Sequence, residues 1–136
     1  MAYWLIKSEP SAWSWQDQLT QQTTQWDGVR NYQASNNLKA MALGDLCFFY
    51  HSVVQRQIVG IVEVTKLYYP DPSDETGRFG MVNVKAVRSL DCPVSLDQIK
   101  SHGHLQHLAL IKQSRLSVMP IDLAAWHLIL ELGTIK

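Results

Sequence analysis

The chain has 136 residues, of which 46% are hydrophobic, enough to bury the core of one globular domain and too many for a disordered chain. Its 12 basic and 12 acidic residues give a formal net charge of +0, which argues against a protein that coats nucleic acid regardless of sequence. That charge does not exclude a module that holds one nucleotide in a pocket. No apolar run approaches the roughly 18 residues of a membrane span.

The first residues and the cysteines predict a soluble, reduced, cytoplasmic protein. The start, Met1-Ala-Tyr-Trp-Leu-Ile-Lys7, lacks the basic leader and long apolar core of a signal peptide. Cys47 and Cys92 are the only cysteines, and neither belongs to a metal-type or redox-type pair. We expect a single domain over residues 1–136.

A short aromatic and β-branched strand is predicted over residues 3–6, and it ends before Pro10, which cannot donate a ladder hydrogen bond. Lys7, Ser8 and Glu9 would then lie at a sheet rim, where side chains can converge on a pocket. The alternative is a plain turn with a weak surface ion pair. Ser14 followed by Asp17 predicts a short helix through Leu19, with Trp13 or Trp15 covering the core. Residues 18–25 form a polar Gln/Thr tract, which we expect to be a connection.

The stretch from Trp26 to Asn37 has the composition of a recognition loop. Trp26 and Tyr32 offer flat aromatic faces, Arg30 offers a planar cation, and four side-chain amides offer donors and acceptors. A nucleobase needs both kinds of group, because its faces stack and its edges form hydrogen bonds. The alternative is a solvated loop with Trp26 as a hydrophobic plug.

In the middle of the chain, Ser35 is predicted to cap a helix over residues 36–42, which Gly44 would end in a left-handed turn. Residues 46–51 are apolar on both faces, which predicts a central buried strand with His51 and Ser52 at its rim. A hairpin connection over 53–57 leads to a partner strand over 58–64. Its Gly60 indicates a bulge or a close backbone approach.

The second half predicts further strands and short helices. Residues 68–72 are expected to form a rigid aromatic and proline loop, and residues 81–88 alternate as a half-exposed strand. A capping box at 95–98 opens a helix, residues 113–119 form a late strand with Arg115 and Ser117 on one face, and Asp122 caps a last helix that Gly133 closes. Five or six strands with short helices between them predict an α+β fold around a small, strongly curved β-barrel.

Metal and catalytic sites find little support. His102, His104 and His107 match neither the helical zinc pair nor a zinc finger, and no cysteine or carboxylate stands beside them. There is no nucleophile elbow, no phosphate-binding glycine loop, and Cys47 lies inside a predicted buried strand. We therefore expect no cofactor, no metal and no enzymatic activity. Glu9 and His51 are the only credible titrating groups for an enzyme of nucleoside modification.

Six stretches, spread in order over nearly the whole chain, resemble the EVE domain family of the PUA-like superfamily. They are Tyr3-Trp-Leu-Ile-Lys-Ser-Glu-Pro10, Trp26-Asp-Gly-Val-Arg-Asn-Tyr-Gln-Ala34, Gly44-Asp45 with Phe48-Phe-Tyr-His-Ser52, Gly60-Ile-Val-Glu-Val64, Tyr69-Pro-Asp-Pro72 and Arg115-Leu-Ser-Val-Met-Pro120. The chain resembles the stand-alone bacterial members, which are similar to the eukaryotic thymocyte nuclear protein. Ser35 stands where the family often has an arginine, and Phe79 stands near a family tryptophan.

The resemblance implies a PUA-like β-barrel with helices closing its ends, and a domain without catalytic activity that reads modified bases, chiefly modified cytosine in DNA. Related YTH domains hold a methylated adenine of RNA in an aromatic cage. Matched to the family motifs, the expected base-binding residues are Ser8, Trp26, Gly28, Val29, Asn31, Tyr32, Gln33, His51 and Ser52. The expected phosphate or rim residues are Lys7, Glu9, Arg30, Tyr69, Arg115 and Ser117.

The sequence therefore predicts a non-catalytic module that binds a modified nucleobase of DNA or RNA in an aromatic pocket at the barrel mouth. Trp26 and Tyr32 would stack on the base, and Trp26→Ala would abolish binding without unfolding the domain. The alternative is a sensor of a nucleotide or other small molecule, or an accessory domain of a restriction or toxin–antitoxin system, that uses the same pocket.

Overall fold

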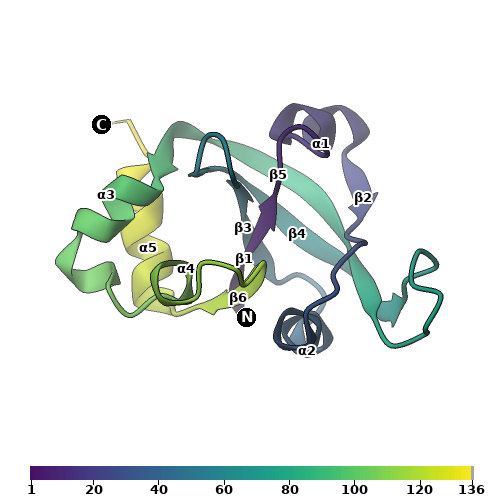
Figure 1. Ribbon diagram of the computed structural model, residues 1–136. Helices are drawn as coiled ribbons and strands as arrows, with labels where there is room; N and C mark the ends of the chain where they lie inside the picture. The colour runs from purple at the N-terminus through teal and green to yellow at the C-terminus, as the bar shows by residue number, and fades with distance from the viewer. Residues whose placement is uncertain (136) are drawn as a thin grey trace.

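The computed structural model describes residues 1–135, in which six strands and five α-helices form one α+β unit (Figure 1). The strands are β1 (Tyr3–Ser8), β2 (Thr23–Gln25), β3 (Leu46–His51), β4 (Gln57–Pro70), β5 (Gly80–Ser95) and β6 (Val118–Ile121). The helices are α1 (Trp15–Gln21), α2 (Tyr32–Ala40), α3 (Leu96–Ser101), α4 (Ala109–Lys112) and α5 (Leu123–Leu132), with a 3-10 turn η1 (Gly103–Leu105) before α4. No helix in this part of the chain is long and apolar enough to cross a membrane.

The strands form a single sheet in the order β2-β5-β4-β3-β1-β6. β1 and β3 run parallel, and every other neighbouring pair is antiparallel. Several register shifts interrupt the long β4–β5 pairing, and such irregularities bend and twist a sheet. The α+β class and the six-strand count agree with the sequence prediction.

The predicted small, curved β-barrel does not close, because β2 and β6 remain the two edges of an open sheet. These strands have only three and four residues, and α2 packs against β4, β5 and β6. The amide of Asn37 in α2 donates to the carbonyl of Val118 at 2.7 Å, and the hydroxyls of Ser35 and Tyr68 lie 3.1 Å apart. A helix thus covers the opening that a closed barrel would seal by strand pairing.

β3 is buried on both faces, as its unbroken apolar run predicts. Neighbouring residues of a strand point to opposite sides, so Phe48 stacks on Trp126 of α5 at 3.8 Å while Phe49 packs against Trp15 of α1 at 5.1 Å. Figure 1 shows α3 and α5 on one side of the molecule and α1 and α2 on the other. The predicted close approach at Gly60 is confirmed, because a Cβ atom there would lie 2.2 Å from the Trp15 ring.

The helix caps that were predicted from short local sequence patterns are confirmed at α1, α3 and α5. Ser14 and Ser95 form capping boxes at α1 and α3, and Asp122 caps α5, which ends at Gly133. The predicted connection over residues 18–25 is wrong, because α1 continues to Gln21 and the next residues pair with β5. This tract is mostly exposed apart from the buried Gln18, and it forms regular backbone hydrogen bonds.

Three other boundaries differ from the prediction. Asn31 caps α2 by accepting the N–H of Ala34 at 2.9 Å, so the helix begins four residues before the predicted start and Ser35 lies buried inside it. β4 runs through to Pro70 instead of giving way to a loop at residue 68. The late strand is only Val118–Ile121, which leaves Arg115 and Ser117 in an irregular segment.

Candidate functional site

The principal cavity has a volume of about 730 Å³ and opens beside the end of β1. β6 pairs with Tyr3 to Ile6 only, so β1 has no complete strand partner on this side beyond that point. The cavity forms in the space between this strand end, the segment before α1, and the chain that leads from β2 to α2. Its lining residues are Lys7, Ser8, Glu9, Ala12, Trp13, Thr24, Gln25, Trp26, Asp27, Gly28, Val29, Arg30, Asn31 and Ser117.

Trp26 is both a core residue and a wall of the cavity. It is 7% exposed, its ring meets Phe49 edge-to-face at 82°, and its backbone N–H donates to Val82 at 2.8 Å. No side-chain nitrogen or oxygen that is fully buried within residues 1–135 lacks a partner, and the indole N–H of Trp26 has no partner there. The N–H is therefore reached by solvent and can donate to a ligand.

The second aromatic wall is Trp13, which the sequence did not assign to the site. Trp13 precedes the Ser14 cap and is half-buried, whereas Trp15 inside α1 packs in the core. Its indole N–H donates to Gln18 at 2.9 Å, and its carbonyl accepts the Ser8 hydroxyl at 2.5 Å. The capping box could have indicated this division, because it places Trp13 outside the helix.

Tyr32 was predicted to stack on the base beside Trp26, but it does not line the cavity. It is the first residue of α2 and is 61% exposed, with its ring 5.0 Å from that of Phe79. The pair of aromatics that face the cavity is therefore Trp26 and Trp13.

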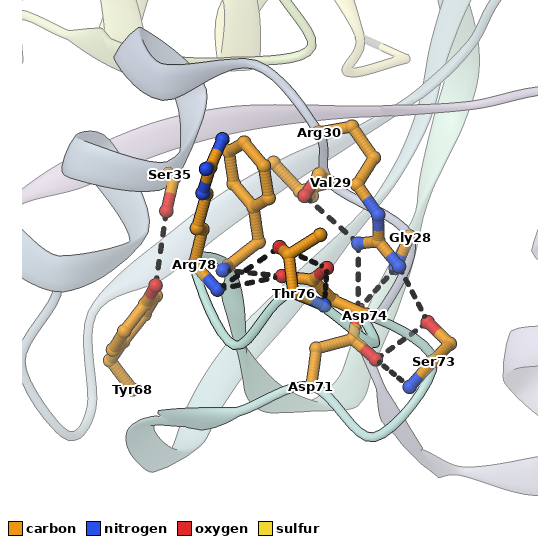
Figure 2. A network of polar contacts seen from close by, with 11 residues as sticks. Gly28, Val29, Arg30, Ser35, Tyr68, Asp71, Ser73, Asp74, Thr76 and Arg78 are labelled. Atoms are coloured by element: carbon orange, nitrogen blue, oxygen red, sulfur yellow. Dashed lines mark hydrogen bonds and ion pairs between the residues drawn. The ribbon is translucent and has the colours of Figure 1, made fainter.

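A buried carboxylate holds the cavity segment 26–31 in place, and Figure 2 shows the network. One oxygen of Asp71 accepts the Gly28 N–H at 2.8 Å and a guanidinium N–H of Arg30 at 3.1 Å. The other accepts the N–H and hydroxyl of Ser73 at 2.8 and 2.6 Å. Gly28 has φ +77°, a left-handed conformation that glycine adopts without strain.

This environment changes the acidity of Asp71. Its side chain is 0% exposed, and burial alone would raise the pKa of the carboxyl. The hydrogen bonds from Ser73, Gly28 and Arg30 outweigh burial and lower the pKa to about 2. Asp71 is therefore ionised at neutral pH and acts as a fixed anchor for the segment.

The cavity lining carries two cations and two anions. Arg30 is paired with Asp71, and the ammonium of Lys7 donates to the carbonyl of Ser114 at 3.0 Å. Burial lowers the pKa of Lys7 from its ordinary value. Glu9 and Asp27 are exposed at the mouth. The cavity thus offers flat rings and hydrogen-bonding groups but no excess of positive charge.

Six of the predicted site residues lie away from the cavity: Tyr32, Gln33, His51, Ser52, Tyr69 and Arg115. His51 is buried, with one ring nitrogen accepting the Trp15 N–H at 2.9 Å and the other 2.5 Å from the Gln55 side chain. Ser52 donates its N–H to Ser8, and Tyr69 donates its hydroxyl to Asn83. These groups support the fold around the site. The other nine predicted residues do line the cavity.

The histidine-rich segment has a structural contact instead of a metal cluster. His107 lies 2.6 Å from Asp122, the cap of α5, and this contact lowers the pKa of Asp122. Among residues 1–135, no group of three His, Cys, Asp or Glu side chains is arranged to hold a metal ion.

Comparison with known proteins places the chain among proteins of the same architecture. The family model "EVE domain" matches residues 2–132. Thymocyte nuclear protein 1 of Rattus norvegicus is 38% identical over 96% of this chain and 73% of its own length. The crystal structure of a protein from Agrobacterium tumefaciens is 41% identical and superimposes with a TM-score of 0.96 over 98% of this chain and 93% of its own.

Two further structures were solved with nucleic acid. The human THYN1 protein, in complex with DNA containing 5-methylcytosine, is 33% identical, with a TM-score of 0.88 over 100% of this chain and 99% of its own. A YTH domain of Zygosaccharomyces rouxii, in complex with N6-methyladenosine RNA, is 16% identical, with a TM-score of 0.59 over 98% and 87% of the two chains. The second likeness concerns the fold alone, and it agrees with the PUA-like architecture.

Proposed function

The chain belongs to the EVE domain family, and on that premise we propose that it is a non-catalytic module that binds a modified nucleobase of a nucleic acid in the cavity lined by Trp26 and Trp13. The human THYN1 protein binds DNA that contains 5-methylcytosine, so a modified cytosine is the first candidate for the base. Both aromatic residues would contact the flat base, and the segment 26–31 would contact its edge.

The observation that carries the proposal is the combination of an anchored ring with free hydrogen-bonding groups. Trp26 is fixed by Phe49 and Val82, so little rotamer entropy is lost when a base packs on it. Its indole N–H and the NH₂ group of Asn31, whose amide oxygen caps α2, are available to the polar edge of a base. A stacked base contributes roughly 1–3 kcal/mol per aromatic contact.

The apolar side of the cavity can distinguish a methylated base from a plain one. Val29 is 7% exposed and lines the cavity beside Trp26. Burying one additional methyl group contributes about 0.8 kcal/mol, which corresponds to about a fourfold difference in affinity. Extruding the base from a duplex costs a few kcal/mol, so single strands and weakened base pairs should be the better ligands.

The test is a titration of tryptophan fluorescence with matched short oligonucleotides. The panel contains single- and double-stranded DNA and RNA that carry plain, methylated or hydroxymethylated cytosine, or methylated adenine. We expect quenching that depends on the modification, with methylated cytosine bound at least about fourfold more tightly than plain cytosine. Equal affinity for modified and plain bases across the panel would refute the proposal.

The burial of Trp26 changes which substitution is suitable for testing its role in binding. Trp26 belongs to the core, so we expect Trp26→Ala to remove buried packing worth about 3–5 kcal/mol and to destabilise the fold, which makes it a poor test of binding alone. Trp26→Phe keeps a ring against Phe49 but removes the indole N–H. We expect it to fold and to lose at least tenfold in affinity for the modified base, whereas Leu123→Ala on the exposed surface of α5 should bind as the parent does.

Binding of a free nucleotide as tightly as an oligonucleotide, in the same titration, would favour the small-molecule sensor instead. The cavity is large enough for either ligand. A catalytic role for His51 is disfavoured by the engagement of both of its ring nitrogens and by its absence from the cavity lining, whereas Glu9, the other candidate titrating group, does line the cavity.

A further inference from the structure

Tyr32, Phe79 and Arg30 form an exposed aromatic and cationic surface next to the cavity, here named the Tyr32 platform. We propose that this platform is a second subsite, which stacks the unpaired nucleotide adjacent to the base held in the cavity. The inference rests on the proposed function and adds to it a contact with single-stranded flanking sequence.

Tyr32 is the most exposed aromatic side chain within residues 1–135, with 61% of its surface accessible. Phe79 lies against it at 5.0 Å with a 38° angle between the rings, so one side of Tyr32 is supported and the other is free. The guanidinium carbon of Arg30 lies 5.9 Å from the Phe79 ring centre. A single exposed ring is common on protein surfaces, but one that lies next to a ligand cavity is available to stack on a base.

The platform is continuous with the cavity. Arg30 and Asn31 both line the cavity, and Tyr32 is the next residue in the chain, about 3.8 Å further on. Arg30 therefore contacts both regions, since it lines the cavity and also approaches the Phe79 ring. A strand whose modified base enters the cavity can therefore place a neighbouring nucleotide over the platform.

The platform is also held in a fixed conformation. Asn31 caps α2 and so fixes the helix turn that carries Tyr32. The backbone N–H of Phe79 donates to Asp74 at 2.7 Å, and its carbonyl accepts the Asp71 N–H at 3.2 Å. A base that stacks there meets rings that need no further ordering, which favours binding.

The chemistry of the surroundings selects a nucleotide over a protein partner. The side chains beside Tyr32 on α2, Gln33 and Asn36, are exposed and polar, so no continuous apolar patch extends along the helix. The exposed ring of Tyr32, which lies beside the Phe79 ring that Arg30 approaches, can stack on any base, whatever the sequence. A protein interface would need a broader apolar centre around an anchor of this kind.

The experiment places 2-aminopurine, a base whose fluorescence falls when it stacks, directly beside 5-methylcytosine in a single-stranded DNA pentanucleotide. Tyr32→Ala is compared with Tyr32→Phe, which keeps the ring, and with Leu123→Ala, which removes an exposed apolar side chain on α5. Affinity for the pentanucleotide is divided by affinity for 5-methyldeoxycytidine monophosphate alone.

We expect the parent protein to quench 2-aminopurine on binding, at one of the two flanking positions. Tyr32→Ala should remove this quenching and lower the affinity ratio about tenfold, whereas Tyr32→Phe and Leu123→Ala should stay within about twofold of the parent. Circular dichroism checks that α2 is intact, as expected because alanine is a good helix former.

The platform is refuted if Tyr32→Ala leaves the ratio and the quenching unchanged, or if it lowers affinity for the mononucleotide and the pentanucleotide equally. Failure of the proposed function gives a different result, because the parent would then not distinguish methylated from plain cytosine. In that event, quenching of a plain pentanucleotide that depends on Tyr32 still supports the platform, and its absence still refutes it.

Discussion

Replacing Asp71 by asparagine should release the segment 26–31 from the turn that follows β4. Each carboxylate oxygen accepts two donors: one faces Gly28 and Arg30, and the other faces Ser73 twice. An asparagine amide has only one oxygen, so its NH₂ group would face either the Gly28 and Arg30 donors or the backbone N–H of Ser73, whose hydroxyl can rotate to accept from it. At least one hydrogen bond is therefore lost, together with the charge that pairs with Arg30.

The magnitude follows from the burial of this group. Hydrogen bonds to a charged group contribute about 1.5–3 kcal/mol each, and breaking a fully buried ion pair costs about 3–5 kcal/mol. The Arg30 side chain is 40% exposed, so its charge is partly solvated after the change. We expect Asp71→Asn to lower the free energy of unfolding by about 2–4 kcal/mol, which is about 1–2 M in the urea midpoint at a typical slope.

Asp74→Asn is a matched control, because Asp74 also accepts four hydrogen bonds, from Thr76, Arg78 and Phe79. All of these lie in its own turn. Amide hydrogen exchange of Gly28 should accelerate about tenfold or more in Asp71→Asn and stay near the parent rate in Asp74→Asn. Equal Gly28 exchange in the two variants would show that Asp71 does not hold the segment.

Two other perturbations test the same region. Gly28 and Gly77 both have positive φ, with open space where a Cβ would lie. Gly28→Ala and Gly77→Ala should therefore each lower the free energy of unfolding in urea by about 1–2 kcal/mol. Only Gly28→Ala should also weaken binding of the modified base. The pKa of Asp71 is about 2, below the value near 3.9 of an unfolded aspartate, so its stabilisation is complete above about pH 5 and is lost as pH falls toward 2. Urea unfolding between pH 6 and pH 2 should therefore lose less stability in Asp71→Asn than in the parent, and an equal loss would contradict this.

The sequence predicted most accurately where a local pattern was sufficient. The apolar run at 46–51 could only be a buried strand, and Ser95 with Gln98 closes a helix start by two reciprocal hydrogen bonds within four residues. At α2 the sequence indicated Ser35 as the cap, and the structure has Asn31 instead. The Ser35 hydroxyl meets Tyr68 of β4, a contact 33 residues away that no local pattern contains.

The residues of the candidate site also divide into those that a local pattern indicated and those that depend on contacts between distant segments. The segment 26–31 stood out by its own composition, and it does line the cavity. Asp71 and Trp13 were missed because their roles depend on how distant segments meet: Asp71 reaches Gly28 across 43 residues. The open edges of the curved sheet were missed for a related reason, since only the packed fold places α2 against the edge strand β6 and the inner strands β5 and β4.

The way in which the segment 26–31 is held matters for what it can recognise. Its two buried residues, Trp26 and Val29, join the core, while a carboxylate and not apolar packing fixes the intervening Gly28. Backbone and polar groups can then remain at the cavity without being buried under other side chains. Such a fixed recognition surface, without an excess of positive charge, gains affinity by stacking and by matching one base edge, in contrast to binders that depend on many phosphate contacts. A balanced net charge is what we expect for a protein that reads one base and its neighbour instead of following a long stretch of backbone.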